Sequence, residues 1–119
     1  PVIEFMPEQK TIGKMGGTMR LGKHKININS NTIASNIYSK KVIHKRHRHR
    51  YEFNKNYHSI VKKFGLILSG SSDNTRRMEM AEIPANKYYF AVQYHAEFDS
   101  RPGKPEEAFE SFLKACIKS

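Results

Sequence analysis

The chain has 119 residues, 38% of them hydrophobic and including six Tyr and seven Phe, which predicts one globular domain and excludes a disordered tail. Lys and Arg number 21 against 11 Asp and Glu, and the net charge of +10 allows a nucleic acid, a nucleotide or an acidic membrane surface as partner. One cysteine excludes an internal disulfide framework, and no apolar run is long enough to span a bilayer. We therefore expect a cytoplasmic protein with no membrane partner. The chain opens on Pro1, which is compatible with a segment of a longer protein.

Two strands and a short helix are expected in the first third of the chain. Residues 2–6 are apolar except for Glu4 and predict one strand, and the alternating residues 18–29 predict a second. Between them, the paired glycines at 16–17 predict a tight turn, because their spacing fits neither a Walker loop nor a dinucleotide fingerprint. A helix over 32–38 follows a polar run that can cap it.

Positive charge is concentrated between residues 40 and 50. Out of context, this run of lysines, arginines and histidines is typical of a nucleic-acid-binding surface. Apolar residues flank it, so we expect an extended strand whose side chains alternate between two faces. One face then carries Arg46, Arg48, Arg50 and Glu52, and the other carries His47, His49 and Tyr51.

The alternation leaves two roles open for the arginines. Either they form a solvated ladder on the sheet, or one of them binds a substrate carboxylate through its planar guanidinium. A metal site at His47 and His49 is disfavoured, because no cysteine or acidic ligand lies near them in sequence and the charge of the run repels a cation. We therefore expect both histidines to pack or hydrogen-bond within the sheet.

The middle of the chain predicts a helix followed by three strands. The helix spans 57–64, and a compact strand over 65–69 follows it. After a polar turn, residues 77–83 alternate and a short link leads to 88–92, so these two strands should pair antiparallel. In the first of these strands, the alternation places Met78 and Met80 on one face and Glu79 and Ala81 on the other.

Residues 88–92 are consecutive aromatic and apolar residues, too few for an ordinary helix. They predict a strand covered on both faces, as in a helix-flanked parallel sheet. His95 and Glu97 follow it, so they should project into the crevice at the carboxyl ends of the strands, where open α/β sheets bind ligands. A carboxylate that orients an imidazole supplies two members of a nucleophilic triad, although most single His-x-Glu sequences are surface pairs.

The end of the chain predicts a loop and a helix. Prolines interrupt regular structure over 101–105, and residues 106–117 show the helical spacing of apolar residues. Cys116 lies on this apolar stripe, so we expect a packed core thiol and not a nucleophile. The stripe consists of Phe109, Phe112, Leu113, Cys116 and Ile117.

Four segments of the sequence are distinctive motifs. They are Gly-Gly-Thr-Met-Arg-Leu-Gly at 16–22, Arg-His-Arg-His-Arg-Tyr-Glu at 46–52, Arg-Met-Glu at 77–79 and Gln-Tyr-His-Ala-Glu-Phe at 93–98. In this order they resemble the glutaminase domain of the CTP synthase family, which is a class I glutamine amidotransferase domain. The resemblance implies an α/β fold over residues 1–119 as a single domain. This would be the C-terminal portion of a flavodoxin-like (Rossmann-like) sheet, with flanking helices and antiparallel additions.

The same resemblance implies the roles of the site residues. His95 is the general base and acid, Glu97 is its orienting partner, and Arg50 binds the α-carboxylate of glutamine with Tyr51 beside it. In the family the nucleophilic cysteine lies upstream in a Gly-x-Cys-x-Gly-x-Gln elbow, as does the glycine-rich oxyanion loop, and neither occurs in these residues. The isolated chain is therefore expected not to hydrolyse glutamine.

Partners also follow from the resemblance. Glutamine is the substrate, and the upstream half of the glutaminase domain and an N-terminal synthetase domain complete an enzyme that assembles as a homo-tetramer. The synthetase domain uses ATP and magnesium to aminate UTP to CTP, whereas this segment is expected to bind no cofactor, no metal and no specific nucleic acid. Lys45 stands where the family has an acidic residue. Ala96 stands where it has proline, so the turn that aims His95 and Glu97 is less stiff.

Two other classes of function stay open. The charge and the run of arginines and histidines favour a basic nucleic-acid-binding module. A non-catalytic assembly fragment, which keeps the surface of the fold without its chemistry, is the other. Whichever function holds, a sheet that lacks its upstream strands would expose an unpaired edge and part of its apolar face.

Overall fold

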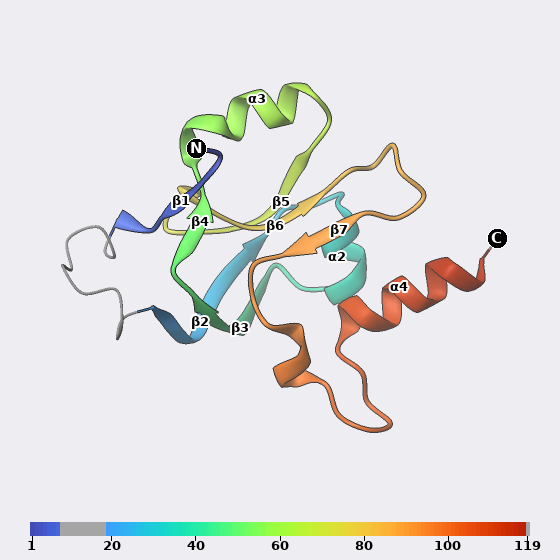
Figure 1. The fold of residues 1–119 in the computed structure, drawn as a ribbon. Coiled ribbons are helices and arrows are strands. Elements are labelled where there is room, and N and C mark those ends of the chain that lie inside the picture. The colour runs from blue at the N-terminus through green and yellow to red at the C-terminus, as the bar shows by residue number, and fades with distance from the viewer. Residues whose placement is uncertain (8–18, 119) are drawn as a thin grey trace.

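The computed structural model describes residues 1–7 and 19–118, so the predicted turn at 16–17 lies outside the described residues (Figure 1). Within them, the strands form a five-stranded antiparallel sheet of order β3-β2-β5-β6-β7 and a two-stranded sheet of β1 and β4. No helix of this part of the chain is long and apolar enough to cross a membrane. The elements are β1 (Ile3–Phe5), β2 (Arg20–Ile28), α2 (Ile33–Tyr38), β3 (Val42–His49), β4 (Tyr51–Phe53), η1 (Lys55–Tyr57), α3 (His58–Lys63), β5 (Ile67–Ser72), β6 (Arg77–Glu82), β7 (Phe90–Val92), η2 (Ala96–Asp99) and α4 (Glu107–Ile117).

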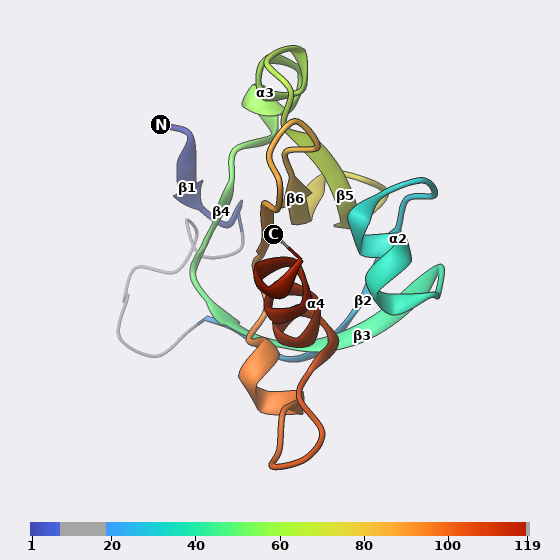
Figure 2. The same ribbon diagram turned by 90° about the vertical axis from the view of Figure 1, so that its right-hand side faces the viewer.

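The basic run is a strand, as predicted. β3 pairs with β2 from Arg20 opposite His49 to Asn27 opposite Val42. Alternate residues of β3 are buried and exposed, so the charged side chains of one face stay in water while the other face is covered. α2 lies between the two strands in the sequence and packs beside α4 (Figure 2).

α2 is short and is stabilised at its N-terminus by two kinds of partner. The Thr32 side chain accepts a hydrogen bond from the Ser35 backbone N–H at 3.0 Å, and the Ser35 side chain accepts one from the Thr32 backbone N–H at 3.1 Å. The buried carboxylate of Glu82 in β6 accepts from the backbone N–H groups of Ile33 and Ala34, at 2.8 and 3.2 Å. A carboxylate is favoured there because it meets unpaired N–H groups and the positive end of the helix dipole.

The hydrophobic core lies between the sheet, α2 and the segment that follows β7. Tyr94 and Ala96, on either side of His95, are 4% and 5% exposed. The candidate catalytic histidine is therefore presented by a backbone that is packed into the core at both neighbouring positions. The buried members of this core are Ile26, Ile28, Ala34, Tyr38, Ile43, Met80, Tyr94 and Ala96.

The prediction that residues 88–92 form a strand covered on both faces, as in a helix-flanked parallel sheet, is wrong for the described residues. β7 spans only Phe90–Val92 and forms one edge of the sheet. Its predicted antiparallel pairing with the preceding strand is confirmed. β6 takes the covered position instead, since all six of its residues are buried, including both Met78 and Glu79 on opposite faces. An apolar run predicts a strand, but its neighbours in the sheet depend on the rest of the fold.

α4 confirms the predicted helix, but the prediction that Cys116 packs in the core is wrong. Cys116 is exposed, as are Phe112 at 52% and Ile117 at 80%. Helical periodicity identifies an apolar face, but it does not say whether another layer covers that face. In the sheet that the described residues form, β7 is an edge strand.

Candidate active site

His95 and Glu97 form a close pair where the chain leaves the sheet. The backbone N–H of His95 donates to the Arg46 carbonyl in β3 at 3.0 Å, and η2 then turns Glu97 back toward the imidazole. His95 Nδ1 lies 2.6 Å from Glu97 Oε1. The imidazole also stacks on Phe98, with 5.2 Å between ring centroids and 21° between ring planes. The side chains of His95 and Glu97 are 37% and 57% exposed, so the pair is open to a substrate.

This geometry fixes the chemistry that each nitrogen of His95 can perform. An ionised carboxylate only accepts hydrogen bonds, so Nδ1 donates and Nε2 is left to take up or release a proton. The hydrogen bond from His95 lowers the pKa of Glu97, which keeps the carboxylate charged. A charged carboxylate orients the imidazole and stabilises its protonated form, as in hydrolase triads.

Arg50 and Tyr51 lie at a bend between β3 and β4. Arg50 is half-buried, and its carbonyl accepts a hydrogen bond from the Met6 N–H at 3.0 Å. The exposed Tyr51 ring stacks on Phe5 at 4.4 Å. The Arg46 carbonyl accepts the hydrogen bond from His95, and Arg50 lies four positions further along the chain. Four residues of extended chain span roughly 13 Å, which limits the distance between the backbones of Arg46 and Arg50. The structure thus brings His95 and Glu97 together, and glutamine binding by Arg50 and Tyr51 stays a prediction.

The predicted common face of the arginines ends at this bend. Arg46 and Arg48 share an exposed face, which fits the solvated ladder, but Glu52 is buried and does not share this face. Its carboxylate accepts hydrogen bonds from Arg77 Nε at 2.7 Å and from Arg76 at 3.1 Å. The alternation fails because the chain passes at Arg50 from the five-stranded sheet to the two-stranded one.

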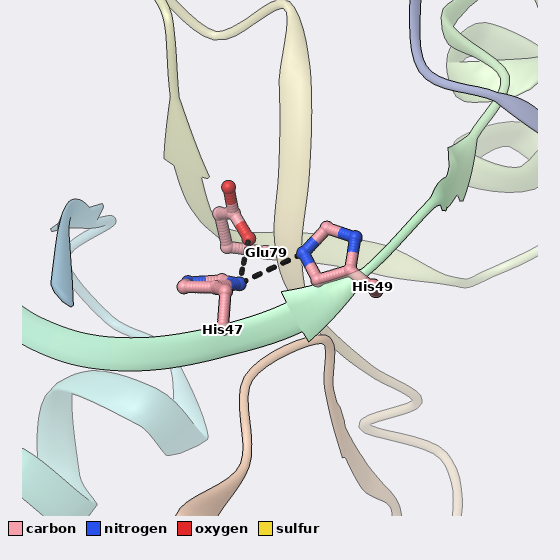
Figure 3. Close-up of side chains that lie close together, drawn as sticks. All are labelled: His47, His49 and Glu79. Carbon is pink, nitrogen blue, oxygen red and sulfur yellow. Dashed lines mark hydrogen bonds and ion pairs between the residues drawn. The ribbon is translucent and has the colours of Figure 1, made fainter. Parts of the chain in front are cut away.

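A second cluster of titratable side chains lies inside the sheet. Figure 3 shows His47 and His49 from β3 meeting Glu79 from β6. His47 Nδ1 is 2.9 Å from His49 Nε2 and 3.7 Å from Glu79 Oε2. Sequence reasoning missed this acid because it looked for ligands near the histidines in the chain, whereas the sheet brings Glu79 in from another strand. The Arg-Met-Glu segment was the available signal.

Arg20 supplies the positive charge of this cluster. Its guanidinium Nη1 lies 2.6 Å from Glu79 Oε1, 3.3 Å from His47 Nδ1 and 3.4 Å from His49 Nε2. Ser72 Oγ donates to the same Glu79 oxygen at 2.6 Å. A metal ion bound by the two histidines and Glu79 would have to displace the guanidinium that already neutralises the carboxylate. The donor set therefore favours an internal ion pair with two neutral histidines.

The Tyr51 carbonyl fixes which ring nitrogens of the two histidines donate and which accept. His49 Nδ1 must donate to the Tyr51 carbonyl at 2.9 Å, because a carbonyl oxygen only accepts. Neutral His49 then accepts at Nε2, and His47 Nδ1 donates to it. The cluster is thus tied to the backbone of Tyr51, next to the predicted glutamine-binding arginine.

Both histidines of the cluster lose basicity on folding. Burial, assisted by the charge of Arg20, lowers the pKa of His47 to about 2 and the pKa of His49 to about 4. Burial also raises the pKa of Glu79, an effect that Arg20 and Ser72 oppose. Protonation of either imidazole in the folded protein would place a second positive charge beside Arg20.

We expect the two histidines to make the free energy of unfolding fall as the pH drops from 6.5 toward 4, whereas Glu79, whose pKa folding raises, acts in the opposite direction. In this window the unfolded chain takes up a proton at each histidine while the folded protein does not, because the folded pKa lies below the unfolded one. Each histidine contributes a slope of up to about 1.4 kcal/mol per pH unit. Urea unfolding at about pH 7 and about pH 4.5 measures the difference. His49→Asn should reduce the slope and His44→Asn, at an exposed position, should not; equal slopes in the two variants would contradict the prediction.

Comparison with known proteins identifies the family to which the chain belongs. The family model described as glutamine amidotransferase class-I matches residues 2–115, and the chain belongs to this family. Within the family it is similar to CTP synthases. It is 48% identical to the CTP synthase of Staphylococcus carnosus (strain TM300) and 46% identical to that of Staphylococcus aureus (strain NCTC 8325 / PS 47), in each case over 118 residues. These alignments cover 99% of this chain and 22% of each relative, so the chain spans about a fifth of their length.

A solved structure supports the same assignment. The structure described as Trypanosoma brucei CTPS, glutaminase domain with bound acivicin, matches with a TM-score of 0.88 and 36% sequence identity. The match covers 99% of this chain and 46% of that one. The predicted α/β fold of a class I glutamine amidotransferase is therefore confirmed, although the described strands are all antiparallel.

Proposed function

We propose that this chain is the histidine–glutamate part of the glutaminase domain of a CTP synthase. The observation that carries the proposal is the 2.6 Å contact between His95 Nδ1 and Glu97 Oε1 on an exposed turn. Contact alone does not distinguish a catalytic pair from a surface pair. Membership of the amidotransferase family, and the packing of Tyr94 and Ala96 on both sides of the histidine, favour the catalytic role.

In the proposed reaction, a cysteine thiolate from outside this chain attacks the carbonyl carbon of the glutamine side-chain amide. Nε2 of His95 gives a proton to the leaving nitrogen as the C–N bond breaks, so ammonia departs. The acyl group is left on the cysteine as a thioester. Water then attacks the thioester carbonyl and gives a proton to the same nitrogen, and the C–S bond breaks, so glutamate is released and the cysteine returns to the thiolate. Glu97 keeps the imidazole oriented through both steps, and Arg50, with Tyr51 beside it, binds the α-carboxylate of glutamine.

The proposal extends to the whole enzyme through the relatives. A separate synthetase domain would use the ammonia, with ATP and magnesium, to aminate UTP to CTP. The predicted homo-tetramer and cytoplasmic location belong to this part of the proposal. The 119 residues would contribute neither the nucleophile nor the nucleotide sites, and their one cysteine, Cys116, lies exposed on α4.

A chimera tests the function directly. This chain replaces the matching segment of the Staphylococcus carnosus CTP synthase, to which it is 48% identical. We expect the chimera to hydrolyse glutamine and the isolated chain to show no such activity, because the chain lacks the cysteine elbow. Glutamate release, measured in both, decides the question. A folded chimera without glutaminase activity, or activity in the isolated chain, would contradict the proposal.

One observation favours a second candidate, binding of nucleic acid. The outer face of the β2–β3 pair is basic, with Lys23 opposite Arg46 and Lys25 opposite His44, all four at the surface. A nucleic-acid-binding module predicts tight binding of oligonucleotides that weakens steeply with salt. The glutaminase proposal predicts only weak, unselective binding. Fluorescence anisotropy of labelled oligonucleotides over a salt series separates the two.

A further inference from the structure

We propose that Lys45 and Asp99 are positioning residues that fix η2 against β3, and thereby hold His95 and Glu97 in their paired geometry. The catalytic meaning of this role rests on the proposed function, whereas the restraint itself is a property of the fold. The roles assigned from the sequence gave these two side chains no part in the site.

Neighbouring residues of β3 hold η2 at both ends. At its beginning, the backbone N–H of His95 donates to the Arg46 carbonyl at 3.0 Å. At its end, the ammonium of Lys45 lies 3.2 Å from Asp99 Oδ2. Glu97, which must stay within hydrogen-bond distance of the imidazole, lies between these two attachments.

Lys45 is well placed to exert this restraint because its charge is buried. Its side chain is 8% exposed, and its ammonium also lies 3.3 Å from Glu106 and 3.9 Å from Glu107. The rings of Tyr38 and Tyr94 lie 5.3 and 6.0 Å from the ammonium. A buried ammonium surrounded by carboxylates and aromatic faces keeps one position, whereas a solvated lysine would be free to move.

The loop after η2 is fixed to the same group of residues. The backbone N–H of Glu106 donates to Ser100 Oγ at 3.0 Å, and the Glu106 carboxylate accepts from the Ala108 N–H at 3.0 Å and from the Tyr38 hydroxyl. The C-terminal side of η2 is therefore attached to α4 and α2 as well as to β3. Loss of the Lys45 charge would leave the Glu106 carboxylate buried without its cation.

η2 is a short 3₁₀ turn of four residues, a geometry whose hydrogen bonds are poorer than those of an α-helix. Backbone hydrogen bonds join it to its flanking residues, from the Phe98 N–H to the His95 carbonyl and from the Ser100 N–H to the Glu97 carbonyl, each at 3.2 Å. Its first residue is Ala96, at a position that accepts proline, which would fix the backbone without the ion pair. The ion pair and a proline at 96 are therefore alternative means of restraining one turn.

The test measures the turn in the 119-residue chain without any assay of turnover. In Asp99→Asn we expect the amide of His95 to exchange with solvent about tenfold faster, because opening of the turn loses a charged contact. The pKa of Glu97 should rise toward its ordinary value as the hydrogen bond from His95 loosens. Amide exchange and carbon NMR of the Glu97 carboxyl group report these two changes.

The matched control is Asp73→Asn, which removes an acid paired with Arg76 and Arg77 in another turn. It should leave both readouts unchanged. Adding Ala96→Pro to Asp99→Asn should restore slow exchange and the low pKa of Glu97, whereas a general loss of stability would not be rescued in this way.

Lys45→Met provides a second variant that keeps the aliphatic stem, and it should reproduce the effect of Asp99→Asn. Unchanged exchange at His95 and an unchanged pKa of Glu97 in folded Asp99→Asn would overturn the proposal, even if Lys45→Met does not fold. An equal effect with and without proline at 96 would also overturn it. These outcomes are distinct from the failure of the proposed function, which is an inactive chimera that contains an intact His95–Glu97 pair.

Discussion

Replacing His95 by alanine in the chimeric enzyme should lower glutamine hydrolysis by about 100-fold to 10,000-fold, the range for loss of a general acid and base. The physical reason is that Nε2 of His95 is the group of the pair that can both give and take a proton near neutral pH, whereas the Glu97 carboxyl group is ionised there and has no proton to give. Glutamate release under saturating glutamine measures the loss. CTP formation from added ammonia should persist, because ammonia bypasses the glutaminase step.

The control for this variant is His44→Ala, which removes an exposed histidine from β3 without touching the turn. It should retain glutamine hydrolysis. Unchanged turnover in His95→Ala would exclude the catalytic role and favour the non-catalytic assembly fragment. Loss of ammonia-dependent CTP formation as well would show that the substitution damages the enzyme beyond the glutaminase site.

The largest effect on stability is expected at Arg20. Arg20→Met should lower the free energy of unfolding by about 3–5 kcal/mol, the range for breaking a buried ion pair by removing one partner. Glu79 is 0% exposed, and without the guanidinium its charge would be buried beside two neutral histidines. Urea unfolding at neutral pH measures the change.

An exposed ion pair of the same chain serves as the control. Lys114→Met removes the contact between Lys114 and Glu110, 2.7 Å apart on the surface of α4. Its effect should stay below about 0.5 kcal/mol. Adding Glu79→Gln to Arg20→Met should recover part of the lost stability, because the uncompensated charge is then removed. Equal small losses at Arg20 and Lys114 would show that the buried pair adds no stability.

Sequence reasoning located the strands and helices where local chemistry decides them. The alternation of β3, the helical stripe of α4 and the antiparallel pairing of β6 with β7 depend on residues close together in the chain. α3 ends near Gly65, whose positive φ of 97° is a conformation that glycine adopts easily. Such features are set by periodicity and turn chemistry, so they can be read from one sequence.

The errors concern contacts between distant segments. The sequence predicts the covered strand at 88–92, but it is β6. The sequence also predicts that the stripe carrying Cys116 packs in the core, but Cys116 is exposed. Glu52 was placed with the arginines and is buried against Arg77. Each error required knowledge of which layer lies above a face, and the residue types of a single segment carry no such information.

The candidate site shows the same division. His95 and Glu97 are two residues apart, so their pairing was predictable from the sequence and the structure brings them together. Lys45 and Asp99 are 54 positions apart, and Arg20 and Glu79 are 59, so only the folded sheet shows that they meet. Lys45 stood out in the sequence only as a departure from the family pattern.

The bend at Arg50 affects how firmly the proposed glutamine-binding residues, Arg50 and Tyr51, are held. On one side, Phe5 of β1 is opposite Tyr51, and the Met6 N–H donates to the Arg50 carbonyl. On the other side, the imidazole of His49 donates to the Tyr51 carbonyl. A ligand bound to the Arg50 guanidinium is therefore held by contacts to both the two-stranded and the five-stranded sheet. If β1 detached, Arg50 and Tyr51 would lose the contacts on that side while keeping the hydrogen bond from His49, and the position of the guanidinium would be less restrained.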